Sequence, residues 1–123
     1  EYRDWLPAEC PSEDAEEITT ATELYRVVRV SPPTAEDFKS HKALRPLKKY
    51  EKGMCKACGL SVARTHSDCV LMSKLPTLVG GLICRIRVNA GGGKIQQNGQ
   101  PIHHTWWPHR GFDHTTTCTV VAE

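Results

Sequence analysis

The sequence has no long run of apolar residues. No stretch approaches the roughly 18 consecutive apolar residues that a membrane-spanning helix needs, so we expect a soluble protein. It also has no internal repeat, which excludes a solenoid or other repeat architecture. No Ser-His-Asp order and no paired-carboxylate motif can be read from it. These absences leave a small globular protein whose chemistry no single motif defines.

The chain also has no large net charge. Sixteen basic residues face 14 acidic ones, and a net charge of +2 is not the electrostatic footprint of a dedicated DNA- or RNA-binding protein. The 123 residues suffice for one hydrophobic core but not for two. The apolar fraction of 39% and the charged fraction of 24% are those of an ordered globular chain.

The charges that are present are unevenly placed. Residues 9–23 carry six acidic side chains and no basic one, whereas residues 39–56 carry seven basic side chains against the single Glu51. Two solvated surfaces of opposite sign explain this pattern. The alternative is that the basic segment, residues 39–56, meets an acidic partner, a phosphate or a nucleic acid.

The chain has six cysteines, an even number that permits a disulfide framework. However, the chain is long enough to form an apolar core, and Cys84 lies inside an apolar strand pattern where a free buried thiol is common. We therefore expect mostly reduced cysteines in a cytoplasmic protein.

The order of predicted elements indicates an α+β fold: a small single domain, mainly antiparallel sheet with two short helices. An irregular acidic N-terminal segment, residues 1–17, precedes the domain at residues 18–123. Strands are predicted at 23–30, 60–64, 82–88, 94–97 and 115–121, and helices are predicted from Thr34 and over 67–75. The Asn98-Gly99 pair predicts a tight turn, and 90–94 is a flexible glycine turn rather than a phosphate-binding loop.

The best candidate for a working surface is the His-Trp segment, residues 103–110. Four of the six histidines lie within residues 103–114, beside two of the three tryptophans. Imidazole acts as base, metal ligand or hydrogen-bond donor near neutral pH, and indole rings offer flat surfaces to a base or a partner. Flanking Pro and Gly residues predict a loop or a short edge strand. The alternative is that the tryptophans plug one end of the core and the histidines are solvated.

A second candidate is a zinc site. The residues Cys55, Cys58, His66 and Cys69 have the spacing C-x2-C-x7-H-x2-C, and tetrahedral zinc takes four such nitrogen or sulfur ligands. Against this interpretation, a predicted strand at 60–64 separates the two halves of the site.

Arg26 and Arg29 lie three apart on the first predicted strand, so they point to opposite faces of the sheet. If one of them points into a pocket, the other then lies on the surface.

Three fragments of the chain resemble a group of uncharacterised small bacterial proteins over about residues 24–110. They are 25–29 with Pro32-Pro33-Thr34 and Asp37-Phe38, then Gly59-Leu60-Ser61-Val62, and then His103-His104-Thr105-Trp106-Trp107. The layout also resembles a minimal ADP-ribosyltransferase fold. That resemblance implies that Arg26 and Ser61 lie beside bound NAD, but Gln96 and Gln97 stand nearest to where such a fold carries its catalytic Glu.

Three functions follow as hypotheses. The first is an interaction protein, an accessory component of a bacterial defence, toxin–immunity or mobile-element system. The second is an NAD- or nucleotide-binding, ADP-ribosyltransferase-like enzyme. The third is a zinc-stabilised module that binds nucleic acid through residues 39–56. The catalytic candidates are Arg26, Ser61, His103 and His104, and the candidates for ligand or partner binding are Tyr25, Thr105, Trp106, Trp107 and Arg110. Convergence of Arg26, Ser61 and the histidines on one cleft would favour a ligand site over an interaction surface.

Overall fold

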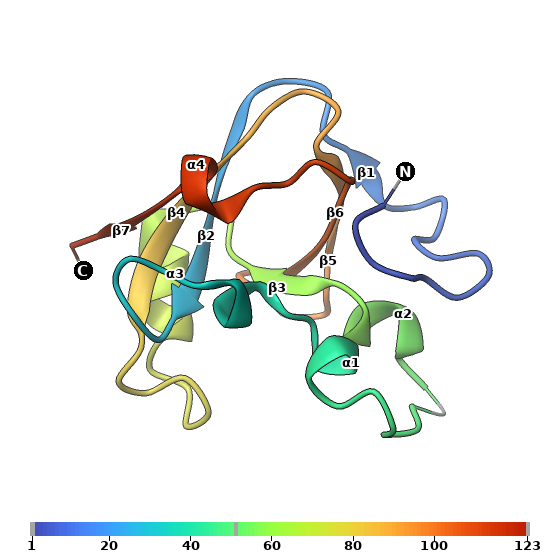
Figure 1. Cartoon of the computed structure of the whole chain (residues 1–123), viewed down its shortest axis with the longest axis horizontal. Coiled ribbons are helices and arrows are strands. Elements are labelled where there is room, and N and C mark those ends of the chain that lie inside the picture. Colours follow the sequence, from blue (N-terminus) through green and yellow to red (C-terminus); the bar gives the residue numbers. More distant parts are fainter. Residues whose placement is uncertain (1, 51, 123) are drawn as a thin grey trace.

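The structure is a computed structural model that describes residues 2–50 and 52–122. It has the α+β fold expected from the sequence, with antiparallel strands in a four-stranded and a three-stranded sheet. Figure 1 shows the three-stranded sheet on the left and the four-stranded sheet on the right. The elements are β1 (Glu16–Glu17), β2 (Thr22–Val28), the 3-10 helix η1 (Ala35–Phe38), α1 (His41–Leu44), α2 (Met54–Ala57), β3 (Leu60–Val62), α3 (His66–Met72), β4 (Leu82–Val88), β5 (Gly93–Gln97), β6 (His104–Pro108), α4 (His114–Thr117) and β7 (Cys118–Val121).

The smaller sheet has the order β2-β4-β7. Its central strand β4 alternates as the sequence predicts, because Cys84, Ile86 and Val88 face the main core while Ile83 packs on α3. Arg26 lies opposite Cys84 in the register of β2 and β4, so its side chain points toward the main core and not toward solvent. An arginine therefore interrupts the apolar face of β2 between the buried residues Leu24 and Val28.

The larger sheet has the order β1-β5-β6-β3. The His-Trp segment supplies its strand β6, which lies between β5 and β3 and is buried throughout. The prediction of a loop or an edge strand is therefore wrong. The loop that joins β5 to β6 spans 98–103, so the Asn98-Gly99 pair begins a longer connection than the tight turn we expected.

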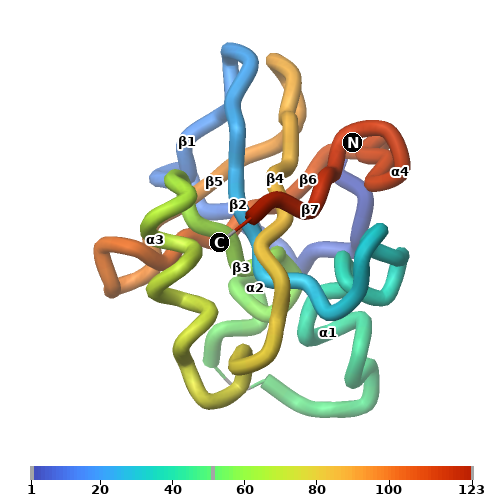
Figure 2. The backbone as a smooth tube through the Cα atoms, turned by 90° about the vertical axis from the view of Figure 1, so that its left-hand side faces the viewer, coloured from blue at the N-terminus to red at the C-terminus, as the bar shows by residue number. Residues whose placement is uncertain are grey.

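The two sheets touch at one antiparallel bridge. Tyr25 and Ala63 exchange both backbone hydrogen bonds there, at 2.9 and 2.8 Å. The main core fills the space between the sheets and includes Leu24, Ile86 and Trp106. A smaller cluster packs α3 against the outer face of β2 and β4 through Cys69, Met72 and Ile83. Figure 2 shows α3 on one side of these strands and α1 on the other.

The helices are short, and local capping sets where they start. Thr34 and Asp37 form a capping box at η1, and the Thr65 side chain accepts a hydrogen bond from the Asp68 amide at the start of α3. Both predicted helices are present, as η1 and α3, and α1, α2 and α4 are short helices that the sequence did not indicate. None of the helices in the described residues is long and apolar enough to cross a membrane.

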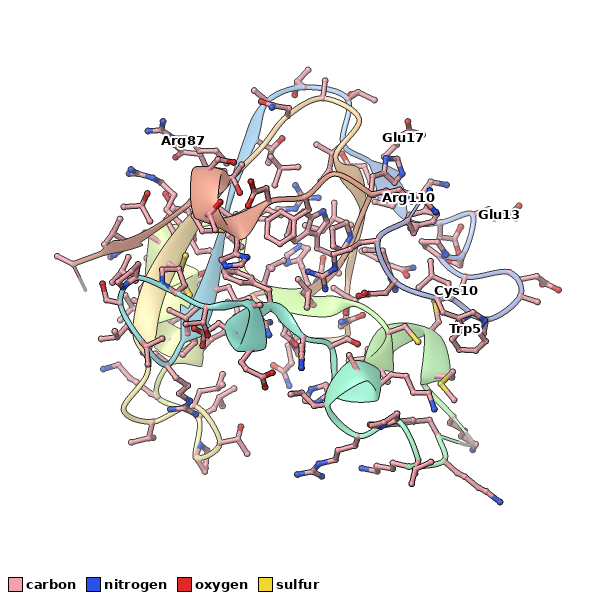
Figure 3. The ribbon with its side chains drawn as sticks, in the orientation of Figure 1. Trp5, Cys10, Glu13, Glu17, Arg87 and Arg110 are labelled. Atoms are coloured by element: carbon pink, nitrogen blue, oxygen red, sulfur yellow. A yellow bond between two sulfur atoms is a disulfide. The ribbon has the colours of Figure 1, made fainter. Side chains whose placement is uncertain are left out.

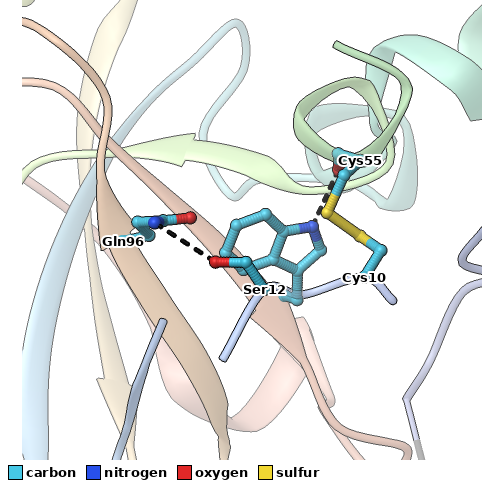
Figure 4. Close-up of a disulfide and its surroundings, with 5 residues drawn as sticks. Cys10, Ser12, Cys55 and Gln96 are labelled. Atoms are coloured by element: carbon cyan, nitrogen blue, oxygen red, sulfur yellow. Dashed lines mark hydrogen bonds between the residues drawn. A yellow bond between two sulfur atoms is a disulfide. The ribbon is translucent and has the colours of Figure 1, made fainter. Parts of the chain in front are cut away.

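The N-terminal residues 2–17, hereafter the lead-in, cover one face of the larger sheet. A disulfide joins Cys10 of the lead-in to Cys55 of α2. Beside it, Ser12 accepts a hydrogen bond from Gln96, and Trp107 Nε1 donates to the Cys55 carbonyl oxygen at 2.9 Å (Figure 4). Our expectation of mostly reduced cysteines is wrong for this pair, whereas Cys58, Cys69, Cys84 and Cys118 are free. The lead-in is irregular as predicted, except that β1 pairs with β5.

Candidate functional site

A cavity of about 220 Å³ lies where β2, β3 and the start of β6 approach α1 and the chain that follows α3. We call it the Arg26 cavity. The side chains that define its chemistry are Arg26, Lys39, Ser40, His41, Ser61 and His103, while Met72, Leu75 and Leu78 form an apolar wall. Three of the four residues predicted to be catalytic from the sequence therefore meet here, and they come from three different strand regions.

Arg26 is held by the backbone. Its Nε donates to the Asp37 carbonyl oxygen at 2.9 Å, and its Nη1 donates to the Ser61 carbonyl oxygen at 2.8 Å. Within the described residues Nη2 makes no hydrogen bond and the guanidinium has no ion-pair partner. Burial, with the nearby charge of Arg3, lowers the pKa of Arg26 to about 10, so the group stays cationic at neutral pH.

Arg29 lies just beyond the end of β2, so alternation within the strand does not determine its direction. Its exposed side chain donates to the carbonyl oxygens of Thr77 and Val79 and does not line the Arg26 cavity. Hydrogen bonds to two carbonyls thus orient both arginines, but only Arg26 faces the cavity.

Ser61 and His103 form the polar centre of the cavity. Ser61 Oγ lies 3.1 Å from His103 Nε2, and both side chains are half-buried. Burial lowers the pKa of His103, and the positive charges of Lys56, His104 and His41 lower it further. The imidazole is therefore neutral at pH 7, with one ring nitrogen free to accept a proton.

The electrostatic environment is positive. His41 at the rim has its pKa lowered by burial and then by Arg26, Arg45, Lys48 and Lys56. Lys39 also lines the cavity, although it pairs with Glu36 at 2.5 Å. Among the described residues that line the cavity there is no carboxylate. An anionic group is the ligand that such a site attracts.

The other residues of the His-Trp segment do not reach this cavity. Trp106 is 1% exposed and belongs to the main core, and Trp107 is 2% exposed beneath the lead-in. Thr105 is also buried and accepts a hydrogen bond from the Asn98 side chain. The prediction that Thr105, Trp106 and Trp107 offer a binding surface is wrong, because β6 is a buried strand and not an edge.

His104 points away from His103, as neighbours on a strand do. Its side chain lines a separate, open hollow with Glu16, Arg64 and Gln97. His104 Nδ1 is buried without a hydrogen-bond partner among the described residues. Burial and Arg64 lower the pKa of His104. His104 therefore does not share a site with Arg26 and Ser61.

Two further candidates lie elsewhere. Tyr25 is half-buried on the outer face of β2, where its ring meets His66 edge to face. Arg110 is exposed and lines a second hollow of about 210 Å³ between the glycine turn at 89–93 and the 109–117 segment. Arg87 lines the same hollow, and Figure 3 labels both arginines, with Arg110 near Glu17.

The predicted zinc site is not formed. Cys55 is consumed by the disulfide with Cys10, and no group of three or more His, Cys, Asp or Glu residues able to hold a metal occurs in the described part of the chain. Cys58 and Cys69 are buried free thiols, and burial raises the pKa of the Cys69 thiol to about 12. His66 instead bonds the Ala122 carbonyl oxygen through Nε2, at 2.6 Å.

Sequence reasoning missed Ser40 and His41. Ser40 caps α1 by accepting a hydrogen bond from the Ala43 amide, which places His41 in the first turn of that helix, at the cavity rim. A capping serine after η1 was the available signal, but the dense basic charge that follows it favoured an irregular linker.

No protein-family model, curated protein or solved structure matches this chain. The resemblances to small bacterial proteins and to ADP-ribosyltransferases therefore stay predictions.

Proposed function

We propose that this protein binds a phosphate-bearing nucleotide in the Arg26 cavity. The observation that carries the proposal is a clamped guanidinium that faces a cavity without any lining carboxylate in the described residues. A partly buried cation without a counter-ion is costly, and an anionic ligand removes that cost. The planar guanidinium also matches the geometry of phosphate oxygens.

The size of the cavity limits the ligand. About 220 Å³ is below the range of roughly 300–1,000 Å³ that is usual for drug-sized ligands. The phosphate and ribose of a mononucleotide, or the same part of a dinucleotide such as NAD, suit this volume. The second half of NAD would then lie outside, toward the basic segment, whose residues Lys48 and Lys56 influence His41 at the rim.

The arrangement supports NAD as one ligand, since Arg26 and Ser61 lie together as the ADP-ribosyltransferase resemblance implies. It does not support glutamate-assisted transfer. Gln96 bonds Ser12 on the lead-in side of the sheet, and Gln97 lines the hollow with His104. Neither residue lines the Arg26 cavity.

Calorimetry with AMP, nicotinamide mononucleotide, NAD and inorganic phosphate tests the proposal. We expect saturable binding that Arg26→Gln weakens about tenfold or more, since a hydrogen bond to a charged group contributes about 1.5–3 kcal/mol. Arg85→Gln is the matched control, because Arg85 lies on the opposite face of the same sheet. Absence of binding heat for every ligand at millimolar concentration would overturn the proposal.

An interaction role in a bacterial defence, toxin–immunity or mobile-element system is the second candidate, and an exposed aromatic residue favours it. Trp5 on the acidic lead-in is 66% exposed and points outward in Figure 3. Aromatic side chains are enriched among residues that anchor protein partners. Loss of partner capture in Trp5→Ala, with Leu71→Ala as an exposed apolar control, would support this surface.

Nucleic-acid binding through residues 39–56 stays a prediction. Lys39 is the one side chain of this segment with an ion pair in the described residues. Binding of single-stranded oligonucleotides that weakens steeply with salt would support it.

The cytoplasmic location also stays a prediction, and the Cys10–Cys55 disulfide argues against it, because disulfides persist mainly in oxidising compartments.

A further inference from the structure

Ser61 and His103 have the geometry of a nucleophile and its general base. The two atoms that would exchange a proton, Ser61 Oγ and His103 Nε2, are 3.1 Å apart, which is within reach for direct transfer. Both residues line the Arg26 cavity, so a bound ligand contacts the hydroxyl directly. They lie 42 residues apart in the chain, and the pairing of β3 with β6 brings them together.

The sheet register explains why the pair meets. Ser61 lies opposite Thr105 in β3 and β6, and His103 lies two residues before Thr105 on the same face. The Ser61 backbone is held as well, because its carbonyl oxygen accepts the hydrogen bond from Arg26 Nη1. The hydroxyl therefore has a defined position relative to both the imidazole and the guanidinium.

The surroundings of the pair determine the protonation state of His103. The lowered pKa of His103 keeps its imidazole neutral, and Nε2 accepts the serine proton when Nδ1 carries the ring hydrogen. Arg26 Nη2, which makes no hydrogen bond within the described residues, can donate to an oxygen that gains negative charge in the transition state.

We propose that Ser61, activated by His103, is the nucleophile of a phosphoryl-transfer reaction on the phosphate ester of the nucleotide bound beside Arg26. This proposal rests on the nucleotide-binding function proposed above. Ser61 Oγ forms a bond to phosphorus, the bond from phosphorus to the leaving oxygen breaks, and the serine proton passes through His103 to that oxygen. Water then attacks the phosphoserine and gives its proton to His103, the bond between Ser61 Oγ and phosphorus breaks, and Ser61 recovers the proton as free phosphate leaves.

A different role for the same contact is that His103 only supports the loop at 98–103. In that case Ser61 is no more reactive than an ordinary serine. Ser67 is an exposed serine in α3, hydrogen-bonded to Thr65 and not to a histidine, and it is the internal standard for this comparison.

The test combines labelling of the folded chain with an aryl fluorophosphonate and hydrolysis of 4-nitrophenyl phosphate and bis(4-nitrophenyl) phosphate. We expect the probe to modify Ser61 and not Ser67, as located by peptide mass spectrometry. Labelling and nitrophenolate release should fall about 100-fold or more in His103→Asn, which is the usual range for loss of a general base. Ser61→Ala should abolish both, and Ser67→Ala should change neither. The thermal unfolding midpoint of each variant shows whether it is folded.

The outcomes separate this inference from the nucleotide-binding function. If calorimetry detects nucleotide binding but Ser61 stays unlabelled and no nitrophenolate forms, the inference is overturned and the binding function stands. Equal labelling of wild type and folded His103→Asn also overturns it, because the base is then not needed. Labelling that depends on His103 without any nucleotide binding overturns the substrate class. If His103→Asn does not fold, the pH dependence of wild-type labelling serves as the test instead. We then expect the labelling rate to rise with pH through the His103 pKa, which lies below 6.5. A flat pH profile overturns the inference.

Discussion

The first residue and the middle of the His-Trp segment have opposite roles. His103 lies just before β6, is half-buried and opens onto the Arg26 cavity, whereas Trp106 and Trp107 are buried inside the fold. The indole nitrogens of the tryptophans are also bonded, to the carbonyl oxygens of Gly92 and Cys55. A dense cluster of reactive and aromatic residues in the sequence thus divides into one site residue and a structural strand.

In this segment, the position of a residue in the sheet outweighs its type. Imidazole and indole are both typical of binding sites, but β6 pairs with strands on both of its sides, and that position decides what each side chain can reach. A site residue in this segment should therefore be replaceable at little cost in stability, and a core residue should not.

The largest effect is expected at Trp106. Trp106→Ala should lower the free energy of unfolding by about 3–5 kcal/mol, since it removes a large buried side chain and leaves a cavity. Urea unfolding followed by circular dichroism measures this loss. Trp5→Ala, at an exposed position, should change the free energy by less than about 0.5 kcal/mol. Similar values for the two variants would remove the basis of the comparison.

The second-largest effect is expected at the disulfide that attaches the lead-in beside Trp107. The double variant Cys10→Ser with Cys55→Ser should lose about 2–4 kcal/mol of stability, because the disulfide no longer restricts the unfolded chain. Dithiothreitol should destabilise the wild type by a similar amount and leave the double variant unchanged. Equal stability of the wild type with and without reductant would contradict a formed disulfide.

A smaller effect is expected at the site itself. Ser61→Ala and His103→Asn each remove one hydrogen bond between half-buried groups, which should cost about 0.5–1.5 kcal/mol in the free energy of unfolding. Their combination should cost little more than either alone, since both remove the same contact. Denaturant titration of the three variants measures this, and losses as large as that of Trp106→Ala would assign His103 to the core.

The smallest effect is a dependence of stability on pH. Burial is the first cause that lowers the pKa of His41, His103 and His104 below 6.5. Between the folded pKa values and pH 6.5, the unfolded chain binds more protons than the folded chain. Stability is therefore greatest above pH 6.5 and falls as the pH is lowered through this range. Below the folded pKa values it stops falling. Unfolding midpoints at about pH 7.5 and about pH 5.5 should show the fall, and His104→Gln should reduce it.

Much of the fold could be predicted from local patterns. Strict alternation at 82–88 predicted β4 with its bounds, and the Thr34 and Asp37 capping pattern predicted where η1 begins. The sequence predicted a loop or a short edge strand where β6 lies, and it missed the central position of β6 because residues buried on both faces show no alternation. The Cys10–Cys55 pairing was also out of reach, since spacing alone does not determine which cysteines pair.

The site was predictable in part. Arg26 and Ser61 were candidates because the ADP-ribosyltransferase resemblance implies them, and His103 was a candidate because of its place in the His-Trp segment. Their contact depends on the pairing of β3 with β6, which local sequence does not encode. His104 was a wrong candidate for the same site because sequence adjacency on a strand means opposite faces.

The Cys10–Cys55 bond also closes a covalent ring that contains only some of the residues lining the cavity. Residues 10–55 form a covalent ring that contributes Arg26 and His41, whereas Ser61 and His103 lie outside it. The exposed lysines Lys48 and Lys49 lie within the ring, so trypsin cleavage there opens the ring without releasing a fragment. A nicked molecule should therefore migrate as one piece on a non-reducing gel and as two pieces after reduction, and it should keep both walls of its cavity tethered.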